Sequence, residues 1–172
     1  MLESRISAND DEFCEGIRLL ENGEHDRAEA YFQQRLDRDN PLVYYGLATA
    51  RFKRDQISLT RDQTLELIDL YKKSMSKKPD FADSYLMCAM AYEQLASVLT
   101  REYKREPYDN QDKKIADIKS TLEEEKNLMD EAVRLNPGFQ EIAESEIKAY
   151  ENRINSLDYL KEYYNASRHL FN

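Results

Sequence analysis

The side chains that most often carry out chemistry in proteins are few in this chain and lie far apart. Its two histidines are His25 and His169, and neither stands in an H-x-x-x-H or H-x-x-E spacing. A zinc site therefore lacks ligands. No two glycines are close enough for a phosphate-binding loop. We expect a protein that is not an enzyme and that needs no cofactor and no metal.

Two other groups of side chains have a structural interpretation and, as an alternative, a functional one. Glu123, Glu124 and Glu125 are consecutive, and consecutive residues of a helix fan around its axis, so a solvated face is expected rather than a metal or catalytic site. The 12 tyrosines are expected to pack mainly with a wet hydroxyl group. A binding role for some of them stays open.

The two cysteines indicate a reducing compartment. Cys14 and Cys88 are far apart, and each lies in a helical pattern. We expect two buried free thiols rather than a disulfide or a redox pair. Cys14 has no histidine near it in the sequence that would activate it as a nucleophile. Residues 1–13 contain no apolar stretch typical of a secretion signal. These observations predict a cytoplasmic protein.

The charge of the chain argues against two classes of partner. The formal net charge is −9 at pH 7, which opposes binding to nucleic-acid phosphates in general. The same charge opposes binding to an anionic membrane surface. No apolar run is long enough to span a bilayer. We therefore expect neither nucleic acid nor a membrane as a partner.

Composition and periodicity predict an all-α fold. The chain has 4 glycines and 4 prolines, and charged residues make up 34% of it. Apolar residues recur at spacings of three and four between these breakers. The first expected helix is capped by Ser7 or Asn9 and ends at Asn22-Gly23. The other expected helices span about 25–38, 41–55, 61–77, 81–105, 111–135 and 139–170, the last being one helix or two with a kink at Asn155-Ser156.

The small and aromatic residues of these helices resemble the tetratricopeptide repeat (TPR) pattern. The matching residues are Gly16, Leu19, Ala28 and Phe32 in a first unit, Tyr44, Leu47, Ala48, Tyr71 and Pro79 in a second, and Tyr85, Cys88, Ala89, Tyr92, Ala132 and Pro137 in a third. The second and third units are longer than the first. The resemblance implies a TPR-like superhelix of antiparallel helix pairs in a single domain, 1–172. Its repeats would span about 9–40, 41–80 and 81–138, followed by a C-terminal capping helix at about 139–171.

The resemblance also implies a concave groove for a partner. In the TPR family, one face of the first helix of each pair lines this groove. The matching positions here are Phe13, Ile17, Leu20, Tyr45, Thr49, Phe52, Leu86 and Met90, with Glu21, Lys53, Asp83 and Glu93 as charged neighbours. Such an apolar groove suits an extended peptide or an amphipathic helix.

The expected function is that of a non-enzymatic interaction module, which acts as an adaptor, a complex subunit or a chaperone. The alternative is a structural subunit that forms a homo-oligomer through the long third hairpin or the C-terminal helix. The apolar residues of the last segment, about 153–171, leave three roles open. The segment caps the last helix pair, folds back into the groove or docks on a partner.

Overall fold

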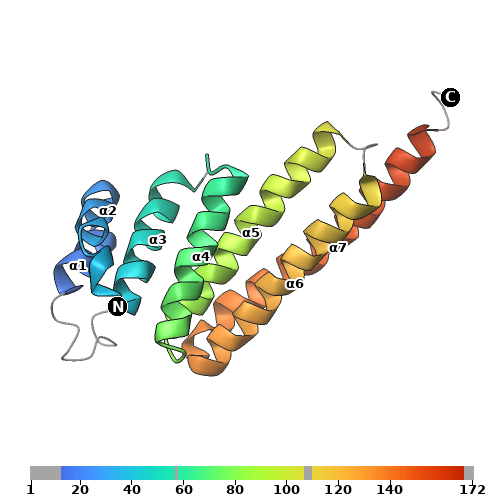
Figure 1. Cartoon of the computed structure of the whole chain (residues 1–172). Helices are drawn as coiled ribbons and strands as arrows, with labels where there is room; N and C mark the ends of the chain where they lie inside the picture. Colours follow the sequence, from blue (N-terminus) through green and yellow to red (C-terminus); the bar gives the residue numbers. More distant parts are fainter. Residues whose placement is uncertain (1–12, 57, 107–109, 169–172) are drawn as a thin grey trace.

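The computed structural model describes residues 13–56, 58–106 and 110–168, and every regular element in these ranges is helical (Figure 1). The α-helices are α1 (Cys14–Glu21), α2 (His25–Gln33), α3 (Pro41–Asp55), α4 (Arg61–Lys77), α5 (Ala82–Arg105), α6 (Gln111–Leu135) and α7 (Gln140–Arg168). Each helix packs against the next one along the chain. The predicted all-α fold with about seven helices is confirmed for the described residues. None of their helices is both long and apolar enough to cross a bilayer.

Local capping signals account for where several helices begin. The Asn40 side chain accepts a hydrogen bond of 2.8 Å from the backbone N–H of Leu42 at the start of α3, and Pro41 is the first helical residue. At α4, Thr60 and Gln63 form the predicted capping box. The expected helices 41–55, 61–77 and 111–135 have these bounds in the structure. The expected cap of the first helix at Ser7 or Asn9 lies outside the described residues.

The second helix is shorter than predicted. α2 ends at Gln33, and a 3-10 turn, η3 (Leu36–Arg38), follows it. Asp39 then adopts a left-handed backbone conformation with a φ of 50°. Its carboxylate accepts a hydrogen bond from the Tyr44 hydroxyl and pairs with Lys77. These contacts hold a turn that the apolar pattern of the sequence does not reveal.

Small residues let the first helices approach closely. Gly16 of α1 and Gly46 of α3 both face the ring of Phe32 on α2, which is fully buried. A β-carbon added at Gly16 would lie 2.5 Å from Cζ of Phe32, and one at Gly46 would lie closer still. Ala28 and Ala89 are also fully buried. Gly16, a predicted small position, and Gly46, which was not predicted as one, therefore lie where the ring of Phe32 needs the space.

The long hairpin of α5 and α6 and the helix α7 form the second half of the molecule. α7 is one continuous helix, so the structure has no break at Asn155-Ser156. It lies behind α6 in Figure 1 and packs on it, after a 3-10 turn, η4 (Pro137–Phe139). Leu157 of α7 is buried in one cluster with Leu122 of α6 and Tyr103 of α5. The C-terminal helix thus covers apolar surface of the preceding pair.

Candidate functional site

The eight side chains predicted to line a concave groove fall into two groups. Five of them are core side chains with at most 5% of their surface exposed, namely Phe13, Ile17, Tyr45, Thr49 and Phe52. The other three are half-buried against core clusters, namely Leu20, Leu86 and Met90. In this conformation, the first group has almost no surface to offer a partner. The structure places these five side chains in the core.

The burial of α3 on several sides explains this placement. The ring of Tyr45 packs on Tyr71 of α4 and on Phe81, with centroid distances of 6.2 and 4.9 Å. The hydroxyl of Thr49 shares a hydrogen bond of 3.3 Å with that of Tyr71. The face of α3 that was expected to bind a partner therefore includes residues of the packed interface between α3 and α4. A helix with neighbours on several sides buries more than one apolar stripe.

A hollow in the described part of the chain lies between α5 and α7. It has a volume of about 430 Å³ and is lined by Ala96, Ser97, Thr100, Arg101 and Lys104 of α5, Leu122 of α6, and Asn152, Arg153, Ser156, Leu157 and Leu160 of α7. We call it the α5–α7 groove. Since α5 and α7 both pack on α6, the side chain of Leu122 contributes to its floor.

The α5–α7 groove carries a charge opposite to that of the whole chain. Arg101, Lys104 and Arg153 line it, and no Asp or Glu does. The whole chain has 34 acidic residues against 25 basic ones. Arg101 and Lys104 are exposed, and neither makes an ion pair with another described residue. Their positive charge is therefore available at the rim of an apolar hollow.

The third cation of the groove, Arg153, is already engaged by three carboxylates from three helices. Its Nη1 lies 3.1 Å from Oε1 of Glu93 on α5. Its Nη2 lies 3.1 Å from Oε1 of Glu125 on α6 and 3.3 Å from Oε2 of Glu146 on α7. One guanidinium therefore links α5, α6 and α7 behind the wall of the groove, and the three carboxylates exceed its charge.

Glu125 is the member of this cluster that is most affected by burial. Its side chain is 3% exposed, and its Oε2 is buried without a hydrogen-bond partner. Burial raises the pKa of Glu125 to about 7, Arg153 opposes this shift, and Glu93 and Glu146 add to it. Burial also raises the pKa of Glu93. The cluster thus favours an added proton near neutral pH.

Glu125 does not lie on the solvated face that the sequence predicts for Glu123, Glu124 and Glu125. Glu123 and Glu124 are exposed as expected, whereas Glu125 is in the interior. One signal was present in the sequence. Glu125 follows Leu122 by three residues and precedes Met129 by four, so it occupies a position in the apolar stripe of α6. A charged residue at such a position indicates a buried ion pair.

Two exposed tyrosines extend the α7 edge of the groove. Tyr159 and Tyr163 are 68% and 56% exposed. Tyr163 follows Ser156 by seven residues, so both lie on the same face of α7. Aromatic side chains are enriched among residues that dominate protein interfaces. Both rings are therefore exposed on the helix that forms one wall of the groove.

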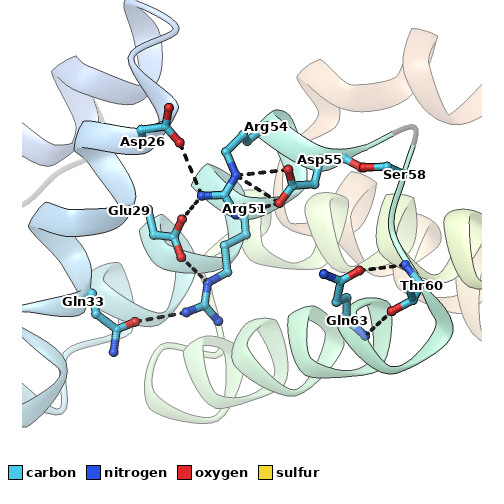
Figure 2. A network of polar contacts seen from close by, with 9 residues as sticks. All are labelled: Asp26, Glu29, Gln33, Arg51, Arg54, Asp55, Ser58, Thr60 and Gln63. Carbon is cyan, nitrogen blue, oxygen red and sulfur yellow. Dashed lines mark hydrogen bonds and ion pairs between the residues drawn. The ribbon is translucent and has the colours of Figure 1, made fainter.

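A second polar region, on the side of α2 and α3, is saturated by its own contacts. Figure 2 shows Arg51 and Arg54 of α3 reaching Glu29 of α2. Nε of Arg51 lies 2.7 Å from Glu29, and its Nη2 donates to Gln33 at 3.1 Å. Arg54 also pairs with Asp55 at 2.6 Å. These guanidinium groups are already bound, so the network joins two helices and leaves little charge for a ligand.

The residues singled out for chemistry are not brought together. Cys14 and Cys88 are both free, which confirms the predicted free thiols, although Cys14 is half-buried rather than buried. Burial raises the pKa of Cys88 to about 12, so its reactive thiolate form is disfavoured. His169 lies outside the described residues. Within the described ranges, no group of three His, Cys, Asp or Glu side chains is placed to hold a metal ion.

The chain matches no protein-family model, and a search among curated proteins gives no match. The resemblance to tetratricopeptide repeats therefore depends on this chain's own residues. Of these, Gly16, Ala28, Phe32 and Ala89 lie in close contacts inside the helical array.

Proposed function

We propose that the protein is a non-enzymatic interaction module that binds a segment of a partner protein in the α5–α7 groove. The observation that carries this proposal is an apolar hollow of about 430 Å³ with free cations at its rim. Its volume is within the range of about 300–1,000 Å³ found for ligand pockets. A trough between two helices is a known form of site for an amphipathic segment. Adaptor, complex subunit and chaperone are all roles that such a module serves.

A TPR-like superhelix is the architecture that we propose for this module. The pairs α1–α2, α3–α4 and α5–α6 would be its three units, with α7 as the capping helix. The packing of Phe32 between Gly16 and Gly46 supports this, as do the contacts of α3 with both α1 and α5. An end helix that covers apolar surface suits a repeat array, whose last unit must be shielded from water. Two free cysteines suit the cytoplasm.

Selection of peptides from a displayed library on the pure protein tests the function. Ser97 is exposed and lines the groove, so Ser97→Trp should fill the hollow without disturbing the core. Ser120 is exposed on α6 and does not line the groove, which makes Ser120→Trp the matched control. We expect peptides that bind the wild type and the control but not Ser97→Trp. Failure to select any peptide, or equal binding to both variants, would contradict the proposal.

Self-association through the C-terminal helix is the second candidate. It is favoured by Tyr159 and Tyr163, which leave a large aromatic surface in water on one helix. The molar mass of the pure protein from light scattering distinguishes the candidates. A stable dimer that becomes monomeric in a Tyr159→Ser, Tyr163→Ser variant would support self-association. A monomer at concentrations of about 100 μM would leave the groove as the functional surface, because a structural interface should be tighter than that.

A further inference from the structure

The geometry points to an acidic amphipathic helix of another protein as the occupant of the α5–α7 groove. This inference rests on the proposed function and adds the class of partner. The apolar stripe of such a helix would lie on the half-buried side chain of Leu160, above the buried Leu122 and Leu157, and its carboxylates would face Arg101 and Lys104.

Charge complementarity is the first argument. Arg101 and Lys104 are three residues apart on α5, so they project from the same side of that helix. Neither is paired with another described residue. The opposite wall, on α7, contributes the neutral side chains of Asn152 and Ser156. An occupant with Glu or Asp along one flank only would meet cations on α5 and hydrogen-bonding groups on α7.

Two other hollows among the described residues lack this charge pattern. The hollow between α3 and α4 that is lined by Arg51 also contains Glu66 and Asp69. The one beside Phe81 contains Asp80 and Asp83. A positive rim without carboxylates thus distinguishes the α5–α7 groove from these two hollows, on a chain with a net charge of −9. Opposite charges across an interface select the partner and speed the encounter.

Shape is the second argument. The groove follows residues 96–104 of α5 and 152–160 of α7. At a rise of 1.5 Å per residue, this is about 12 Å, or slightly more than two helical turns. Two helices with a third beneath them form a trough into which a further helix can pack by the usual ridge-and-groove geometry. Apolar anchors at positions i, i+3, i+4 and i+7 span about the same length.

Three synthetic peptides test this class of partner on the full chain. The first is an amphipathic helix of about four turns with Leu anchors and Glu on one flank. The second has Lys in place of each Glu. The third keeps the first composition but carries two central prolines, which prevent a helix. Fluorescence anisotropy of labelled peptides at low salt gives the dissociation constants. We expect the first peptide to bind at least tenfold more tightly than either of the others.

Charge reversal on the protein locates the site. The double variant Arg101→Glu, Lys104→Glu should bind the acidic peptide at least tenfold more weakly, because two attractions become repulsions. Lys53→Glu with Lys113→Glu makes the same change in net charge on exposed side chains outside the groove, and should change binding less than about twofold. Circular dichroism checks that both variants keep their helices. Equal loss of binding in the two variants would overturn the inference, since it would indicate attraction to the whole surface.

The outcomes separate this inference from the proposed function. The basic or the proline-containing peptide could bind more tightly than the acidic helix, and the Ser97→Trp variant could lose that binding. This result would overturn the inference of an acidic helical partner but keep the groove as a binding site. Failure of all three peptides, while displayed peptides still require the groove, would also reject this class of partner alone. A groove filled by a second copy of the chain would appear as a dimer that the acidic peptide cannot dissociate, and this would overturn the inference as well.

Discussion

Gly46 of α3 lies directly against the ring of Phe32 of α2, with no space between them for a β-carbon. The ring atoms that would meet the added carbon are Cε1, Cε2 and Cζ. Gly46 is in the interior of a helix, where glycine is otherwise about 1 kcal/mol less favourable than alanine. The contact with Phe32 therefore decides whether a substitution of Gly46 stabilises or destabilises the protein.

We expect Gly46→Ala to lower the free energy of unfolding by about 1–3 kcal/mol, because the new methyl group overpacks the site. Urea denaturation measures this loss. Phe32→Leu removes the three ring atoms named above, so the double variant Gly46→Ala, Phe32→Leu should show a favourable coupling of about 0.5 kcal/mol or more. A stabilising effect of Gly46→Ala on its own would mean that helix propensity outweighs the contact, against our expectation.

Stability should depend on pH through Glu125. Its pKa of about 7 in the fold lies above its value of about 4.3 in an unfolded chain. Its contribution is therefore fully present below about pH 4 and is lost as the pH rises through 7. Glu125→Gln keeps a neutral side chain of the same shape. We expect this variant to be more stable than the wild type at pH 8 by about 1–3 kcal/mol, with a clearly smaller difference at pH 5.

Denaturant titrations at pH 5, 6.5 and 8 check this prediction. Glu124→Gln is the control, because Glu124 is the exposed neighbour of Glu125 on the same helix. Its stability should follow the wild-type curve at each pH. If the stability of the Glu125→Gln variant depended on pH as the wild type does, other groups would cause the pH dependence. Glu93 would be the first of these to test, since burial raises its pKa in the same direction.

Arg153 should hold α7 onto α5 and α6. Arg153→Met keeps much of the aliphatic chain but leaves Glu93, Glu125 and Glu146 close together without a cation. Breaking a buried ion pair by removing one partner costs about 3–5 kcal/mol. We expect hydrogen exchange of the backbone amides in residues 150–164 to accelerate at pH 8 before the rest of the molecule opens.

The matched control for Arg153→Met is Lys148→Met, since Lys148 is an exposed cation of the same helix. It should leave amide exchange in α7 unchanged. In the wild type, we expect protected amides through 157–164. Exchange at random-coil rates there would mean that α7 does not pack on α5 and α6 in solution, and that this segment is itself available to a partner.

Cys88 should resist thiol reagents while the protein is folded. It is fully buried, and burial raises its pKa to about 12, so almost no thiolate forms at pH 8. We expect the Cys14→Ser variant, which retains only Cys88, to react with an aromatic disulfide reagent at least about a hundredfold more slowly in buffer than in denaturant. Mass spectrometry counts the modified thiols. Rapid native labelling of this variant would indicate that the core around α5 opens readily.

The bounds of several helices could be predicted because they depend on neighbouring residues. Asn40 with Pro41, and Thr60 with Gln63, act on backbone groups within one turn. The expected helix 111–135 likewise lies between a polar loop and Asn136-Pro137. By contrast, the early end of α2 involves Asp39 and Lys77, which are 38 residues apart, and no local pattern contains that contact.

The candidate site was beyond prediction for the same reason. An apolar residue such as Phe52 has the same local pattern whether its helix has neighbours on one side or on several, so only the packing of α3 decided that it is buried. The α5–α7 groove combines residues more than 50 positions apart, and it exists because α7 packs on α6 and leaves a trough beside α5. Sequence alone determined that the fold is helical and where most of its helices lie, because hydrogen bonds within a helix span four residues. The tertiary structure decided which faces stay in water, because burial depends on every helix that packs nearby.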